Sequence, residues 1–268
     1  MAFLHRRFYL FVSVLLIFIT GCAVSPTGRK QLMLVSENEA IQASKQAYVE
    51  MLAPLEKQGK LDNDPVVANR IQNITQRLIS QAIILRPETK SWNWTVKVID
   101  DPAVINAWCM AGGKMAIYTG LINKLSATDD EIAQVMGHEI SHALANHTAE
   151  RMSVAIASSM GVMAVSVLTE QKGIATASAA VAAKLAVELP NSRTSESEAD
   201  RIGIELAAKA GYSPHAAVTL WQKMAKAGGG KQLEFLSTHP SPGNREQTLR
   251  DLIPQMMPYY DKASATLK

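Results

Sequence analysis

Two histidines four residues apart, with a glutamate directly after the first, are the residues of this chain best suited to chemistry. His138 and His142 would project from one face of a helix, so both imidazoles could bind the same metal ion. Glu139 would reach a water molecule beside that ion rather than the ion itself. Zinc lowers the pKa of a bound water toward about 7, and a carboxylate can then accept its proton. This spacing predicts one catalytic zinc ion per chain.

A zinc site needs a third protein ligand, and the chain has no closely spaced pair of cysteines to supply sulfur. His147 lies five residues after His142, which turns it off the ligand face, so we expect a core or surface histidine. Glu196 and Asp200 lie four residues apart on a predicted helix and would face the same way. Glu196 could bind the metal while Asp200 orients a ligating histidine. Spacing alone does not distinguish Glu196 from Glu198, and an acidic, solvated helix face is the alternative.

Two helices must position these groups. The first is predicted to begin after Thr128, because Thr128 and Glu131 match a capping box, and its apolar residues continue to Leu144. The two histidines lie between these apolar residues, which argues against a pair of surface histidines with no role. The second helix should run over residues 193–210, with Gly211 as its C-cap.

The N-terminal region, residues 36–90, is predicted to form helices that pack on the catalytic part. A capping box begins at Ser36, and Pro65 suits the first position of a second helix. Residues 94–99 alternate with a period of two, and residues 114–118 follow two glycines; these are the only strands we expect. The predicted fold class is α+β, mostly helical, with a small sheet beside the histidine-bearing helix.

The N-terminus has the pattern of an exported lipoprotein. In residues 1–21, two arginines precede an apolar run that suits a signal peptide and is short for a membrane span. An uncleaved anchor is the alternative. Cys22 ends a sequence that resembles a lipobox, so we expect it to carry lipid and to attach the mature chain to a membrane. Residues 22–35 are predicted to form a tether, and residues 36–268 a single domain.

Composition excludes other classes of function. The chain has 268 residues and a net charge of +3, without a run of lysines and arginines, which excludes a nucleic-acid-binding protein. The second cysteine, Cys109, is expected to be a buried, inert thiol. Residues 152–189 are rich in small residues, and we expect helices that pack on or near a membrane or form a lid, not a span.

Together these motifs resemble one family. The sequence H-E-x-x-H at residues 138–142, followed by E-x-x-A-D at residues 196–200, is similar to the gluzincin zinc metalloproteases of HtpX and the CAAX prenyl endopeptidase. The resemblance extends to exported lipoprotein and periplasmic members such as LoiP and BepA. The resemblance implies a zincin-like fold, with Glu139 as the catalytic base and zinc held by His138, His142 and Glu196. It selects Glu196 over Glu198 and places Asp200 behind the ligands.

The resemblance also assigns roles to a loop and a strand. His239 and Arg245 are similar to a loop element of the exported members, and in some of these members the histidine reaches the zinc and blocks the water position. His239 could thus inhibit the enzyme, assist the transition state or have no role. The strand at residues 114–118 is expected to be the edge strand of the cleft and to pair with an extended peptide substrate.

Two functions follow from these expectations. The first is a zinc endopeptidase that cleaves unfolded or misassembled envelope proteins. Because Ala23 follows Cys22, the lipoprotein would be sorted to the outer membrane and face the periplasm. The second is a chaperone-like envelope assembly factor whose zinc site is structural or silent. An intact Glu139 favours the first.

Overall fold

The computed structural model describes residues 22–163, 190–228, 234–240 and 243–266. The predicted signal peptide, residues 1–21, lies outside the described part. So do residues 164–189, which make up most of the region expected to pack near a membrane or form a lid. In the described residues the chain is mostly helical with small sheets, which confirms the predicted fold class.

A three-stranded sheet lies at the centre of the fold. Its strands are β3 (Thr95–Ile99), β4 (Ala107–Met110) and β5 (Lys114–Tyr118). The order is β3-β5-β4, with β5 parallel to β3 and antiparallel to β4. The expectation that residues 114–118 form an edge strand was therefore wrong, because β5 is central and β4 is at the edge. Strand β4 was missed because all four of its side chains are buried, which removes the alternating pattern.

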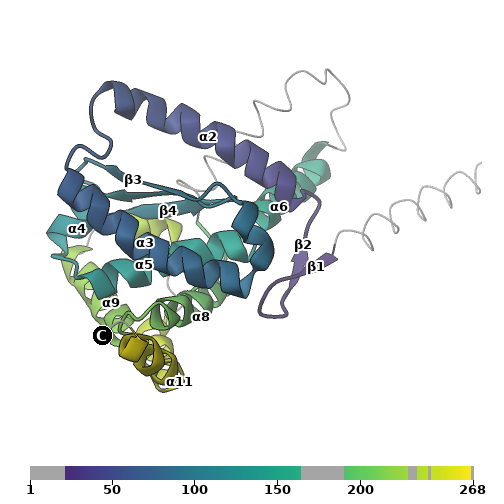
Figure 1. Ribbon diagram of the computed structural model, residues 1–268. Helices are drawn as coiled ribbons and strands as arrows, with labels where there is room; N and C mark the ends of the chain where they lie inside the picture. The colour runs from purple at the N-terminus through teal and green to yellow at the C-terminus, as the bar shows by residue number, and fades with distance from the viewer. Residues whose placement is uncertain (1–21, 164–189, 229–233, 241–242, 267–268) are drawn as a thin grey trace, which may run out of the picture.

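Helices cover both faces of this sheet (Figure 1). Helix α2 (Glu37–Lys57) lies on one face, while α3 (Pro65–Leu85) and α5 (Asp129–Leu144) lie on the other. The capping boxes predicted at the starts of α2 and α5 are both present. Apolar contacts on the face covered by α3 and α5 hold the sheet against α5, the helix that carries the two histidines.

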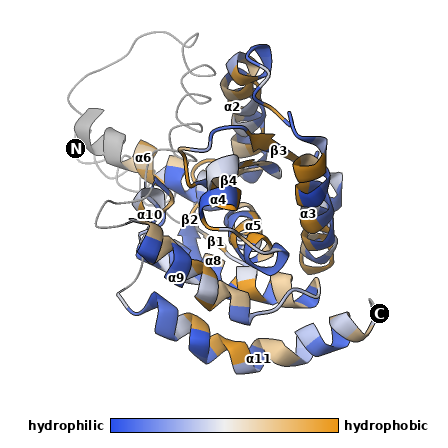
Figure 2. Cartoon of the chain, turned by 90° about the vertical axis from the view of Figure 1, so that its left-hand side faces the viewer, coloured by the Kyte–Doolittle hydropathy of each residue, from blue (hydrophilic) through white to orange (hydrophobic). Residues whose placement is uncertain are grey.

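Further helices build on α5. Helices α8 (Arg193–Lys209) and α9 (His215–Gly228) both pack against it, and α11 (Arg245–Thr266) packs on α8 and α9 through a separate apolar cluster (Figure 2). The predicted helix 193–210 is confirmed, and Gly211 follows it with a φ of 77°. The shorter or peripheral elements are a 3-10 helix (Pro87–Ser91), α4 (Thr119–Lys124), α6 (His147–Met163) and α10 (Glu234–Thr238). Among the described residues, no helix combines the length and apolar character needed to cross a membrane.

The segment expected to be a tether is folded. Strands β1 (Cys22–Val24) and β2 (Lys30–Leu32) form an antiparallel hairpin whose turn contains Gly28 at a φ of 87°. Arg29 fixes this hairpin to the helices, since its guanidinium forms ion pairs of 2.6 Å with both Glu150 on α6 and Glu198 on α8. These contacts join residues more than a hundred positions apart, so they leave no local pattern in the sequence. The segment was therefore predicted to be a tether.

Candidate metal centre

Helices α5 and α8 approach each other closely at two glycines. A Cβ added to Gly137 on α5 would lie 2.9 Å from the carbonyl oxygen of Gly203. A Cβ added to Gly203 on α8 would lie 2.8 Å from the backbone of His138. The missing side chains let the two backbones touch beside the first histidine. Side chains of α8 thereby reach the histidine face of α5.

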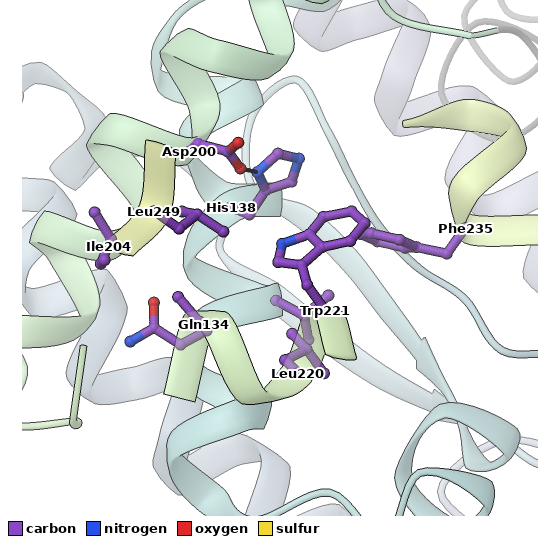
Figure 3. Close-up of a pocket in the computed structure, with 10 residues that line it drawn as sticks. Gln134, His138, Asp200, Ile204, Leu220, Trp221, Phe235 and Leu249 are labelled. Atoms are coloured by element: carbon purple, nitrogen blue, oxygen red, sulfur yellow. Dashed lines mark ion pairs between the residues drawn. The ribbon is translucent and has the colours of Figure 1, made fainter. Parts of the chain in front are cut away.

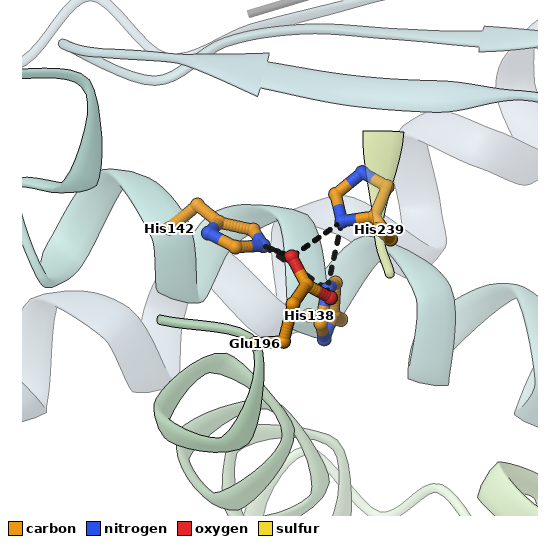
Figure 4. A group of neighbouring side chains, drawn as sticks. All are labelled: His138, His142, Glu196 and His239. Atoms are coloured by element: carbon orange, nitrogen blue, oxygen red, sulfur yellow. Dashed lines mark hydrogen bonds and ion pairs between the residues drawn. The ribbon is translucent and has the colours of Figure 1, made fainter. Parts of the chain in front are cut away.

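Four buried side chains meet at this crossing (Figure 4). His138 and His142 come from α5, Glu196 from the first turn of α8, and His239 from the loop that follows α10. One ligand atom from each lies within 4.8 Å of the others. The residues that could hold a metal ion are thus brought together from three separate segments.

The spacing of these atoms fits a small tetrahedral ion. His138 Nε2 is 3.0 Å from His142 Nε2 and 3.2 Å from His239 Nδ1. The Glu196 carboxylate is 3.1 Å from His239 and 3.4 Å from each of the other two imidazoles. Four ligands at 2.0–2.1 Å from a tetrahedral zinc ion would lie about 3.3 Å from one another. The nitrogen and oxygen donors present therefore suit zinc in both geometry and chemistry.

Glu139 is buried beside the cluster without belonging to it. Its Oε1 is 3.3 Å from His239 Nε2 and has no hydrogen-bond partner among the described residues. Burial raises the pKa of Glu139, although the neighbouring His239 and His138 oppose this effect. A carboxylate with a raised pKa and a free oxygen beside a metal cluster is suited to accept and return a proton near neutral pH.

A carboxylate and a guanidinium support His138 from behind. Asp200 Oδ1 is 3.0 Å from His138 Nδ1, in the pocket that Trp221 and Phe235 also line (Figure 3). Burial alone would lower the pKa of His138, but Asp200 and Glu196 outweigh it and raise the pKa to about 9.

Arg245 closes this side of the cluster. Its guanidinium hydrogen-bonds to Asp200, lies 3.1 Å from Glu196 Oε2 and is 3.7 Å from the centre of the Trp221 ring. The positive charge balances the two carboxylates and holds both in place. The structure thus brings His239 and Arg245, which only the resemblance had singled out, to the same cluster.

Sequence reasoning missed a contact behind His142. His147 does not belong to the donor cluster, but its Nδ1 is 2.7 Å from His142 Nδ1. Helix α5 ends at Leu144, and Asn146 turns the chain with a φ of 55°, so the helical phase assumed for His147 does not apply. An asparagine two residues after a helix is a signal that could have shown the turn.

Glu198 lies on the far side of His147 from the cluster. Its Oε2 is 3.2 Å from His147 Nε2, so the two glutamates of α8 face different neighbours. Burial would raise the pKa of Glu198, but hydrogen bonds from His147, Ser25, Thr27 and Arg29 lower it far below the usual range. Burial lowers the pKa of His147 despite Glu198 and favours its neutral ring.

Two members of the donor cluster, His142 and Glu196, have pKa values that are both lowered, but for different reasons. Burial lowers the pKa of His142 well below its ordinary value, which favours the neutral imidazole that a metal requires. Burial would raise the pKa of Glu196, but the neighbouring histidines, His239 above all, lower it well below its ordinary value.

The two cysteines lie apart from this chemistry. Cys109 is buried in β4, and burial, with a smaller contribution from Glu139, raises the pKa of its thiol well above the ordinary value. The prediction that this thiol is buried is confirmed, and the raised pKa is consistent with low reactivity. Cys22 is the first residue of β1, and its lipidation stays a prediction.

The fold and the donor cluster define a zincin-like metallopeptidase, and sequence comparison gives its family. The model of Peptidase family M48 matches residues 65–253, and the chain belongs to this family.

Relatives of the chain differ in length. The mitochondrial metalloendopeptidase OMA1 of Bos taurus is 33% identical over 90% of this chain and 47% of its own length. OMA1 of Arabidopsis thaliana is 38% identical over 59% of this chain and 31% of its own length. Metalloprotease LoiP of Escherichia coli is 30% identical over 87% of this chain and 91% of its own length. The chain thus spans about half or less of these OMA1 proteins but nearly all of LoiP.

Proposed function

We propose that this protein is a zinc-dependent endopeptidase, anchored to the outer membrane through lipidated Cys22 and facing the periplasm, that cleaves unfolded or misassembled envelope proteins. The observation that carries the proposal is the buried Glu139 carboxylate beside four convergent donor atoms. A structural zinc site needs ligands but no neighbouring base. The similarity to proteases such as LoiP supports the peptidase activity, and the lipobox-like sequence supports the location.

The proposed mechanism assigns a task to each residue. His138, His142 and Glu196 would hold zinc, which supplies the Lewis acidity that polarises the scissile carbonyl. Glu139 accepts a proton from the attacking water and later donates it to the leaving amine. Asp200 keeps a proton on Nδ1 of His138, so that Nε2 is free to bind the metal.

The substrate would bind beside strand β4 rather than β5. Among the described residues, β4 has β5 on one side and no strand on the other. An extended peptide that pairs there makes hydrogen bonds through its backbone, which any sequence can offer. Broad specificity for unfolded chains follows from this mode of binding.

His239 would keep the resting enzyme inactive. Its Nδ1 faces the donor cluster and its Nε2 faces Glu139, so the ring occupies the space between base and metal that an attacking water needs. A catalytic zinc requires an open position, which a fourth imidazole closes. The ring stacks on Phe235, with centroids 4.3 Å apart, and a substrate would have to displace it from this contact.

The purified mature protein tests the proposal through zinc content and casein cleavage. Glu139→Gln keeps the size of the side chain but removes the base, so cleavage should fall by about 10²–10⁴-fold. Zinc content should stay at one ion per chain. Equal cleavage by variant and wild type would refute the peptidase. Prevention of aggregation by both proteins, without cleavage by either, would favour the chaperone-like assembly factor.

A further inference from the structure

A line of hydrogen-bonding groups leads away from the donor cluster through His142. The Nε2 atom of His142 faces the cluster, while its Nδ1 is 2.7 Å from His147 Nδ1. On the other side of that ring, His147 Nε2 is 3.2 Å from Glu198 Oε2. His147 is 1% exposed, so water does not compete for either contact.

Only one arrangement of protons satisfies this line when His142 binds a metal. The metal takes Nε2, so the proton of His142 is on Nδ1 and must be donated to His147 Nδ1. His147 therefore carries its own proton on Nε2 and donates it to the Glu198 carboxylate. The negative charge at the end of the line makes each imidazole in turn a better acceptor and a better ligand.

The N-terminal hairpin holds the end of this line. Arg29 Nε donates to Glu198 Oε2 at 2.6 Å, and the hydroxyls of Ser25 and Thr27 donate to Oε1. The two terminal nitrogens of Arg29 bind the two oxygens of Glu150, each at 2.6 Å. Apart from His147, the hydrogen-bond partners of the Glu198 side chain in the described residues all come from the hairpin.

We propose that His147, Glu198 and Arg29 are positioning residues for the metal ligand His142, and that docking of the hairpin thereby sets the zinc affinity of the site. The inference rests on the proposed zinc site but concerns residues that neither bind zinc nor touch substrate. The hairpin begins at Cys22, so the segment next to the expected lipid would be coupled to the metal. Groups that orient a metal ligand typically change metal affinity by about 10–100-fold.

Competition with a chromophoric chelator measures the zinc Kd of the mature full-length protein and its variants. His147→Leu, which removes both ring nitrogens, should weaken zinc binding by about 10–100-fold, and Arg29→Ala or Glu198→Gln by about tenfold. His147→Gln offers an amide oxygen to His142 and an amide nitrogen to Glu198, so it should recover most of the loss. This rescue separates orientation of His142 from a general loss of folding.

Glu131→Gln is a matched control. Glu131 is also a buried carboxylate that accepts from a hydroxyl, Thr219, and from a cation, Lys223, but it lies at the opposite end of α5 from His142. The substitution should destabilise the fold and leave the zinc Kd within about threefold of wild type, because Glu131 orients no metal ligand. An equal loss of zinc affinity in Glu131→Gln and Arg29→Ala would overturn the proposal.

A double-mutant cycle tests whether the residues act in series. Adding Arg29→Ala to His147→Leu should change the zinc Kd little further, because the line is already broken; independent effects would instead multiply. Multiplying effects, or wild-type zinc affinity in Arg29→Ala, would overturn the proposal while leaving the peptidase intact. Failure of the wild-type protein to bind zinc would refute the proposed function together with this inference.

Discussion

His138 and His142 lie one helical turn apart on α5, yet their far nitrogens are supported in two different ways. His138 Nδ1 is 3.0 Å from the carboxylate of Asp200, on the same helix as Glu196. His142 Nδ1 is linked to the Glu198 carboxylate through the ring of His147. The first support is fixed by the packing of α5 on α8. The second depends also on a hairpin at the other end of the sequence, so the two supports should respond differently to changes at the N-terminus.

The largest effect expected from a single substitution concerns the two glutamates of α8. Glu196→Ala should lose zinc, because it removes the one carboxylate among the four donors that meet at the buried site. Glu198→Ala should still bind one zinc per chain at saturating metal, although with weaker affinity, because it removes only the end of the support behind His142. Metal analysis of both variants checks this. Zinc retained in Glu196→Ala and lost in Glu198→Ala would exchange the two roles.

The direct and the indirect support can be compared through equivalent substitutions. Asp200→Asn should weaken zinc binding by up to about 100-fold and Glu198→Gln by about tenfold, because the first charge is one hydrogen bond from a ligand and the second is two. Chelator competition under the same conditions gives both values. Equal losses would mean that distance along the line does not matter.

The third imidazole, His239, comes from the loop after α10, and its far nitrogen, Nε2, faces the proposed base Glu139 rather than a supporting carboxylate behind the cluster. His239→Ala should keep zinc and raise basal casein cleavage. If the state with His239 on the metal is favoured by about 1.4 kcal/mol, about nine-tenths of the molecules are inactive at rest. Removing the imidazole would then raise the cleavage rate by up to about tenfold. Reduced cleavage at unchanged zinc content would instead assign His239 to the transition state.

The smallest effect concerns stability at the N-terminal end of α5. Glu131 is buried, but Lys223, Thr128 and Thr219 outweigh this burial and lower its pKa below the ordinary 4.5. A lowered folded-state pKa gives stability that is present above the unfolded pKa and lost as the pH falls through the folded pKa.

Glu131→Gln should therefore reduce the free energy of unfolding by about 1–2 kcal/mol at pH 7. The difference from wild type should shrink as the pH falls below about 4.5. Urea unfolding between pH 3 and pH 7 measures it. A difference that does not change with pH would show that the charge of Glu131 is not what stabilises the helix.

Local sequence signals predicted much of the fold. Capping boxes at Ser36 and Thr128 and the proline at residue 65 marked helix starts that the structure confirms. Strand β4 was not predicted, because burial on both faces removes the alternation of apolar and polar residues. The hairpin escaped because the ion pairs of Arg29 are non-local, and no local pattern of residues encodes them.

The candidate site could also be predicted only in part from local sequence signals. Spacing on one helix was enough to pair His138 with His142. The choice of Glu196 and the involvement of His239 came from family resemblance, because the contacts that gather them join three segments. His147 lies outside the donor cluster, as expected, but its contact with His142 was not predicted because a continuous helix was assumed where Asn146 turns the chain.

The contact of Gly137 with Gly203 has a consequence for which ion the site accepts. The close contact of the two backbones lets the Glu196 carboxylate of α8 lie 3.4 Å from each of the two imidazoles of α5. A methyl group at either glycine would separate the helices and widen the cage. Larger ions with longer bonds and more ligands, such as calcium, would then be less disfavoured relative to zinc. We therefore expect the two glycines to favour a small ion, although neither of them contacts the site's donor atoms.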